Sequence, residues 1–186
     1  MTTRSIKNSA LRIIKKEAEA VARLDAYIND QFVQAVETIA ASSGKLVVSG
    51  VGKSAIVARK IVATLNSTGT PAAYMHAGDA IHGDLGMIGE KDIVMLISKS
   101  GESPEIRLLI PLLNRDRHTL IGMVGNMQSF LAKKADILLD TTVPEEACVH
   151  NLAPTSSTTA QMVMGDALAI TLMELKGFST EDFARF

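Results

Sequence analysis

A chain of 186 residues is long enough for one domain with its own core, and its formal charge of −1 excludes a broad basic surface. We therefore expect neither nucleic acid nor a membrane as a partner. Apolar residues make up 47% of the chain but aromatic residues only 4%. The core is thus expected to consist of aliphatic side chains and the nine methionines, which suits helices packed on a parallel sheet.

The cysteine content and the N-terminal residues bear on the compartment. The single cysteine, Cys148, excludes an intrachain disulfide and fits a reducing environment. Residues 1–16 lack the apolar segment of a signal peptide, and no apolar run approaches the length that crosses a bilayer. We expect a cytoplasmic protein.

The first element in chain order is a helical pattern over residues 6–43. Apolar positions such as Ile6, Ile13 and Ile14 keep a helical spacing, and Phe32 and Val36 continue it in a second segment. We predict that residues 1–43 form an N-terminal helical segment that packs either on the domain or on a neighbouring subunit. Residues 44–186 then form the ligand-binding domain.

From residue 44 onward, short apolar runs alternate with helical patterns. The runs predict five strands, at residues 46–48, 72–74, 93–97, 120–124 and 137–139. The helical patterns cover residues 54–66, 104–116, 127–133 and 155–176. This alternation predicts an α/β fold, a three-layer αβα sandwich with a five-stranded parallel sheet, preceded by N-terminal helices. Ligands of such folds bind outside the carboxyl ends of the strands, where the strand order reverses.

A glycine-rich turn follows the first predicted strand and contains Gly52, Lys53 and Ser54. It is not a P-loop, because position 47 is Val where the Walker spacing requires Gly. It loosely resembles the pattern of dinucleotide-binding folds, but the second strand runs into His76 and offers no acidic residue for a ribose. A nicotinamide site and a plain tight turn with a solvated lysine both stay open on this pattern.

A hydroxyl-rich turn follows the third predicted strand. Ser103 is well placed to cap the next helix, and Pro104 fits its first position. Backbone N–H groups, the positive end of the helix dipole and the hydroxyls would then converge on a spot that suits a phosphate. The turn consists of Ser98, Lys99, Ser100, Gly101, Glu102 and Ser103.

A second hydroxyl-rich turn precedes the last long helix. Residues 155–159 are five consecutive hydroxyl residues, whereas capping needs one. The alternative is a threonine-rich first turn that packs against a neighbour.

Acidic and imidazole side chains lie near these turns. A carboxylate beside a phosphate site can remove a proton next to a sugar carbonyl, provided that burial raises its pKa toward neutrality. The plainer alternative for each is a surface carboxylate or a hydrogen-bonded loop histidine. No spacing resembles a zinc site, and we expect no metal. The candidates are Glu102, Glu105, Glu145, Glu146, His76, His82 and His150.

These motifs follow one another along the chain together with five further segments, at residues 66–71, 82–86, 146–148, 164–167 and 177–183. In that combination the chain closely resembles, over essentially its whole length, the sugar isomerase (SIS) domain of arabinose-5-phosphate isomerases. The resemblance implies a flavodoxin-like SIS fold. It also implies interconversion of D-arabinose 5-phosphate and D-ribulose 5-phosphate, which supplies Kdo for lipopolysaccharide or capsule in Gram-negative bacteria.

The resemblance also implies roles for particular residues. Lys53, Glu105, Glu146 and His82 would be catalytic. No cofactor is expected, because the hydrogen moves as a proton within the substrate. A homodimer or homotetramer is implied, and a downstream Kdo-type regulator could share the pocket. The residues implied to bind the substrate and its phosphate are Gly52, Ser54, Ser98, Ser100, Glu102, Ser103, Thr155, Ser156, Ser157 and Thr158.

The chain departs from the family pattern at three places. Lys99 stands where members commonly carry Asn, and Val149 where a Pro usually follows the cysteine. The family usually continues after residue 183 into a segment that supplies a catalytic histidine, often followed by paired CBS domains, whereas this chain ends at Phe186. A truncated isomerase is therefore expected. The alternative is a non-catalytic SIS module that binds a sugar phosphate or a nucleotide sugar.

Overall fold

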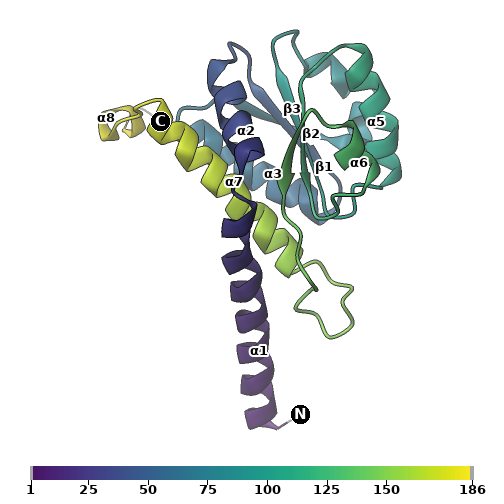
Figure 1. The fold of residues 1–186 in the computed structure, drawn as a ribbon, viewed down its shortest axis with the longest axis vertical. Coiled ribbons are helices and arrows are strands. Elements are labelled where there is room, and N and C mark those ends of the chain that lie inside the picture. Colours follow the sequence, from purple (N-terminus) through teal and green to yellow (C-terminus); the bar gives the residue numbers. More distant parts are fainter. Residues whose placement is uncertain (1, 185–186) are drawn as a thin grey trace.

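A computed structural model describes residues 2–184 of the chain. Helices and strands alternate from residue 46 onward, as the sequence pattern predicts (Figure 1). The helices are α1 (Thr3–Ala22), α2 (Asp30–Ala41), α3 (Lys53–Ser67), α4 (Ala77–Ala80), α5 (Pro104–Arg115), α6 (Phe130–Lys134), α7 (Ser156–Leu175) and α8 (Thr180–Phe183), with 3-10 turns η1 (Arg23–Tyr27) and η2 (Asp84–Met87). The strands are β1 (Leu46–Gly50), β2 (Ala72–His76), β3 (Ile93–Ser98), β4 (Leu120–Val124) and β5 (Ile137–Asp140).

The five strands form one parallel sheet in the order β2-β1-β3-β4-β5. The chain runs outward from β1 to β2 and then crosses to the other side of β1, so that the strand order reverses between β1 and β3. Gly50 at the end of β1 is paired with Ile97 near the end of β3. The loops after these two strands are therefore neighbours at the carboxyl edge of the sheet, where doubly wound folds bind ligands.

Helices cover both faces of the sheet (Figure 1). A hydrophobic core lies between the helices and the sheet on each face. Successive side chains of a strand point to opposite faces. Leu46 and Val48 of β1 consequently pack with α2, α3 and α7, whereas Val47 packs with α4, α5 and α6. The predicted three-layer αβα sandwich is confirmed.

The N-terminal helical segment differs from the pattern expected for residues 6–43. It is divided by η1 into α1 and α2, and Asn29 begins the second helix by accepting a hydrogen bond from the Gln31 N–H at 2.9 Å. α2 packs on the sheet, while α1 lies along α7 and extends beyond the α/β body (Figure 1). Its contact with a neighbouring subunit stays a prediction.

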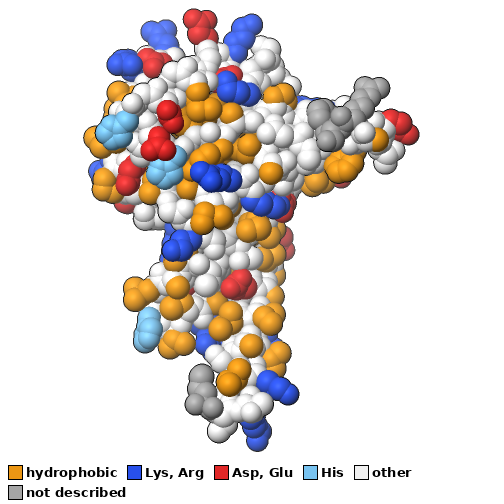
Figure 2. Space-filling model, turned by 180° about the vertical axis from the view of Figure 1, so that it is seen from behind, with side chains coloured by type: hydrophobic (Ala, Val, Ile, Leu, Met, Phe, Trp, Pro, Cys, Tyr) orange, Lys and Arg blue, Asp and Glu red, His pale blue; other side chains and the backbone are white. Residues whose placement is uncertain are grey.

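Hydrophobic side chains remain exposed on the extended part of the molecule. Seen from behind, they gather along the narrow lower part as well as on the body (Figure 2). On α1, Ile6, Leu11 and Ile14 are more than half exposed. Within residues 2–184, no helix has the length and hydrophobicity that crossing a membrane would require.

Smaller differences concern element boundaries. α6 begins at Phe130 rather than at residue 127, because the Ser129 hydroxyl caps it by accepting from the Ala132 N–H at 3.2 Å. β1 and β2 each continue two residues further than predicted. The one-turn elements α4 and η2 are too short to leave a periodic pattern and were not predicted.

Candidate functional site

A cavity of about 300 Å³ lies at the carboxyl edge of the sheet, between the loops after β1 and β3 and the beginning of α7. A larger depression of about 590 Å³ lies between α2, α6 and the residues that follow α5, and it contains no predicted site residue. We take the smaller cavity as the candidate site because it lies where the strand order reverses. Its lining residues are Val51, Lys53, Ser54, Ile97, Ser98, Lys99, Ser100, Ser103, Ile106, Pro154, Ser157 and Thr158.

Two helices begin at the cavity without a side-chain cap. α3 starts directly after Gly52, whose φ of 58° places the backbone in the region that favours glycine. α5 starts with Pro104 at its first position, as predicted, but the predicted cap by Ser103 is wrong, since the Ser103 hydroxyl makes no capping bond. Both N-termini therefore keep N–H groups that can attract an anion.

The Ser103 hydroxyl is a polar group without a hydrogen-bond partner. Its Oγ is buried, no described residue bonds it, and Ser103 lines the cavity. A buried hydroxyl with no partner costs free energy, and a bound oxyanion would remove that cost.

Hydrogen bonds brace the turn after β3. The Ser98 Oγ accepts from the Gly101 N–H at 3.0 Å, and the Ser100 Oγ accepts from the Glu102 N–H at 3.3 Å. A hydroxyl that accepts one bond can still donate its own hydrogen. Both serines can therefore face a ligand while holding the turn.

Glu102, Glu105 and His82 do not line the cavity, although the sequence placed all three at the site. Glu102 pairs with Arg107 and accepts from the Phe130 N–H at 2.8 Å, so its carboxylate links the turn to α6. Glu105 is half-buried in the first turn of α5. His82 is exposed in the loop after α4.

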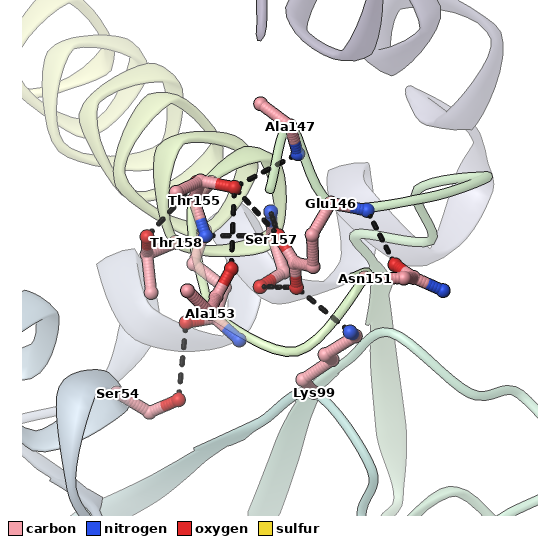
Figure 3. A network of polar contacts seen from close by, with 10 residues as sticks. Ser54, Lys99, Glu146, Ala147, Asn151, Ala153, Thr155, Ser157 and Thr158 are labelled. Atoms are coloured by element: carbon pink, nitrogen blue, oxygen red, sulfur yellow. Dashed lines mark hydrogen bonds and ion pairs between the residues drawn. The ribbon is translucent and has the colours of Figure 1, made fainter. Parts of the chain in front are cut away.

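Glu146 is fully buried and caps α7 (Figure 3). Its Oε2 accepts from the backbone N–H groups of Thr155 at 2.8 Å and Ser157 at 3.1 Å, and its Oε1 accepts from the Ser157 Oγ at 2.5 Å. The Thr155 hydroxyl lies 3.2 Å from Oε2 and also accepts from the Ala147 N–H at 2.9 Å. The backbone N–H groups of Thr155 and Ser157, two residues expected to bind the substrate, are thus bonded to Glu146.

A lysine completes the surroundings of this carboxylate. The Lys99 Nζ lies 2.7 Å from the Glu146 Oε1, and the lysine side chain points from the turn after β3 toward α7 (Figure 3). Burial alone would raise the pKa of Glu146, but the bonds from Lys99, from the Ser157 hydroxyl and from the backbone N–H groups outweigh it and lower the pKa to about 2. The raised pKa expected for a catalytic carboxylate is therefore not found in this structure.

The other expected site residues occupy different positions. Lys53 is exposed at the start of α3 and makes no hydrogen bond or ion pair with any described residue. The Ser54 Oγ donates to the buried Gln161 at 3.1 Å, and the Thr158 Oγ1 donates to the Thr155 carbonyl at 2.9 Å. Ser156 is buried and its Oγ has no described partner, but it lies outside the lining, as does Gly52.

Two residues of the site were missed from sequence. Gln161 fixes Ser54 from the second turn of α7 and carries no local signal. Lys99 departs from the family pattern inside the turn after β3, and that departure is the one signal in the sequence that distinguishes it. The described residues contain no group of three or more His, Cys, Asp or Glu side chains that could hold a metal ion.

The fold is a doubly wound α/β fold, and its candidate site lies at the switch point of the sheet. Two uncapped helix N-termini, two lysines and several hydroxyl side chains surround this site. These features define a class of proteins with a site suited to an anionic ligand. The SIS domain model matches residues 39–171, and the chain belongs to the SIS domain family. The resemblance drawn from the sequence motifs is thereby confirmed.

Curated relatives are arabinose 5-phosphate isomerases KdsD. The relative from Yersinia pestis is 54% identical over 173 residues, which cover 93% of this chain and 53% of the relative. The relative from Pseudomonas aeruginosa is 53% identical over 177 residues, covering 95% of this chain and 54% of the relative. The chain therefore spans about half the length of the curated relatives it matches.

Solved structures match nearly end to end. The structure of E. coli CFT073 c3406 in complex with arabinose 5-phosphate has a TM-score of 0.95 and 38% identity, and the match covers 99% of this chain and 98% of the other. A putative sugar-phosphate isomerase from Listeria monocytogenes also has a TM-score of 0.95, with 36% identity, covering 99% of this chain and 97% of the other.

Proposed function

We propose that the protein interconverts D-arabinose 5-phosphate and D-ribulose 5-phosphate. The observation that carries the proposal is the cavity itself, which is bordered by uncapped helix N-termini and the unpartnered Ser103 hydroxyl. Two of its lining residues, Lys99 and Ser157, contact the carboxylate of Glu146, which is fully buried and does not itself line the cavity. The names of the curated relatives and of the solved structure with bound arabinose 5-phosphate support the choice of substrate.

The phosphate in this proposal binds at the start of α5. Ser100, Ser103 and the free N–H groups of the first turn of α5 would receive it, with Lys53 and Lys99 supplying positive charge. Ser54, Ser157 and Thr158 line the rest of the cavity and would contact the sugar hydroxyls.

The chemistry assigned to the carboxylate is proton transfer. Glu146 would remove the proton on C2, the C–H electron pair would form the C1–C2 double bond of an enediolate, and the proton would return to C1 while the O2 proton passes to O1. Lys53 would stabilise the developing oxyanion. The sequence resemblance also implied that Glu105 would orient Lys53 or carry a hydroxyl proton and that His82 would assist hydroxyl proton transfer. Neither residue lines the cavity, so we leave these two roles out of the proposal.

Proton NMR of D-arabinose 5-phosphate with the protein in D2O tests the proposal. We expect loss of the C2 proton signal and appearance of ribulose 5-phosphate. An unchanged spectrum, together with thermal stabilisation by the sugar phosphate, would replace the proposal by the alternative, a non-catalytic SIS module that binds the ligand without turnover.

Three further expectations belong to this proposal. A place in Kdo synthesis for lipopolysaccharide or capsule, with a Kdo-type regulator in the same pocket, follows from the proposed reaction. A cytoplasmic location fits the single cysteine, Cys148. We also expect assembly into a dimer or tetramer.

A further inference from the structure

Lys99 contacts both parts of the candidate site. Its ammonium lies 2.7 Å from the Glu146 carboxylate, while its side chain lines the cavity with Ser100 and Ser103. The Lys99 side chain is 45% exposed, whereas that of Glu146 is 0% exposed. One cation thus contacts a fully buried carboxylate and lines the open cavity.

Within residues 2–184, Lys99 is the cation that pairs with Glu146. Other charged groups on the neighbouring elements have different partners or lie elsewhere. Arg12 of α1 donates to the Ala147 carbonyl, Lys16 pairs with Glu145, and Glu17 accepts from the Thr159 hydroxyl. The remaining titratable groups nearby are Lys53 at the start of α3, and Cys148 and His150 in the loop of Glu146.

We propose that Lys99 is a positioning residue through which the substrate phosphate controls the Glu146 carboxylate. The inference rests on the proposed function. Without ligand, the ammonium holds Glu146 against the N-terminus of α7. When a phosphate occupies the start of α5, the ammonium turns to it, and Glu146 loses its charged partner.

Electrostatics give the direction of the effect. A phosphate dianion attracts Lys99 away from Glu146, and its own negative charge disfavours a second anion close by. Both changes raise the pKa of Glu146 from about 2, and the burial of the side chain then acts in the same direction. A carboxylate with a higher pKa is a stronger base, so the base is activated only when substrate is bound.

The direct test is a titration of the Glu146 carboxyl carbon by NMR in protein labelled with 13C-glutamate. The Glu146→Gln variant assigns the signal. We expect a pKa of about 2 in the free protein and an upward shift with saturating D-arabinose 5-phosphate or inorganic phosphate. An unchanged pKa in the ligand-saturated wild-type protein would overturn the inference, and this measurement needs no Lys99 variant to fold.

Three variants separate the charge of Lys99 from its packing. Lys99→Met is expected to raise the Glu146 pKa without ligand and to reduce the further shift with phosphate to the part that the phosphate charge causes directly, and Lys99→Arg to restore the wild-type behaviour. Lys16→Met removes the partner of the neighbouring Glu145 and serves as the matched control, with no effect on Glu146. A Glu146 pKa that stays near 2 in Lys99→Met would show that Ser157 and the backbone N–H groups hold it alone, contrary to the proposal.

Kinetics distinguish this inference from the proposed function. For an active enzyme, Lys99→Met should raise KM about tenfold through the lost charged contact and change kcat less than about threefold. In this variant kcat/KM should also fall at acid pH, because Glu146 of the free enzyme then becomes protonated at a higher pH than in the wild type. If the protein isomerises the substrate but the pKa of Glu146 does not shift on ligand binding, the inference about Lys99 fails and the proposed function stands. A phosphate-dependent shift without any ribulose 5-phosphate would overturn the isomerase proposal and leave control of the carboxylate by Lys99 standing.

Discussion

At the scale of single residues, the observed role of Glu146 as a helix cap and its proposed role as a base require opposite changes of its pKa. As the cap of α7 it is bonded to two backbone N–H groups, two hydroxyls and Lys99, and these contacts stabilise the charged form. As a proposed base it needs an affinity for protons that those contacts suppress. A Glu146 variant therefore has separate consequences for activity and for stability.

Activity is expected to depend on the carboxylate. Glu146→Gln keeps the shape of the side chain but cannot take up the C2 proton, so turnover of D-arabinose 5-phosphate should fall by at least ~100-fold, the usual scale for loss of a general base. Phosphate binding, measured by calorimetry, should be retained or become tighter, because Lys99 no longer has to leave a charged partner. Wild-type turnover in this variant would remove Glu146 from the base role.

Stability should depend on pH through the same group. The folded-state pKa of about 2 lies below the ordinary value of 4.5, so Glu146 contributes stability above pH 4.5 and loses it as the pH falls toward 2. The contribution is on the order of 3 kcal/mol. Urea unfolding at pH 7, 4 and 3 should show a smaller loss on acidification for Glu146→Gln than for wild type, while Glu145→Gln, at an exposed neighbour, should match wild type.

At the scale of elements, the turn between β3 and α5 carries the proposed phosphate site, and its backbone conformation depends on one glycine. Gly101 has a φ of 65°, and a Cβ there would lie 2.1 Å from the Ser129 Oγ, the cap of α6. The turn and the start of α6 are therefore packed too closely for any side chain at this position.

We expect Gly101→Ala to destabilise the protein by about 1–3 kcal/mol through backbone strain and this contact, and to weaken phosphate binding by displacing Ser100 and Ser103. Thermal unfolding with and without phosphate measures both effects. Gly86→Ala is the matched control, because its φ is ordinary and its Cβ would meet no atom within 4 Å. Equal melting temperatures for the two variants would contradict the close approach of the turn to α6.

At the scale of the whole molecule, α1 extends beyond the α/β body and keeps an apolar surface in contact with solvent (Figures 1 and 2). Ile6, Leu11 and Ile14 are 56%, 55% and 64% exposed; Leu11 and Ile14 are three positions apart, and Ile6 lies eight positions before Ile14, so both pairs have a helical spacing. Such a face on an extended helix is typical of association with a second copy.

We therefore predict a dimer or tetramer in solution. Ile14→Glu places a charge in the apolar face of α1 and should shift the protein toward monomer in analytical ultracentrifugation. Asn8→Glu adds the same charge on the same helix at an exposed polar position and should leave the assembly unchanged. A monomeric wild-type protein, or equal behaviour of the two variants, would contradict a role of α1 in assembly.

The local features of the chain could be predicted from the sequence alone. The apolar run at residues 93–97 identifies a strand, because a short apolar run bounded by turn residues is a property of neighbouring positions. Pro104 marks the start of α5 in the same way, since the preference of proline for the first helical position is also local. The five strands, the layered α/β fold and the SIS family were accessible in this way.

Only the tertiary structure decided which side chains meet. Lys99 and Glu146 are 47 positions apart, and no local pattern indicates that a lysine after β3 pairs with a carboxylate that caps α7. Ser103 occupies a capping position without capping, and Glu102 turns to α6 rather than to the cavity. These outcomes depend on where distant segments pack and on which charges they bury together, and that information is distributed over the whole fold rather than carried by any one stretch of residues.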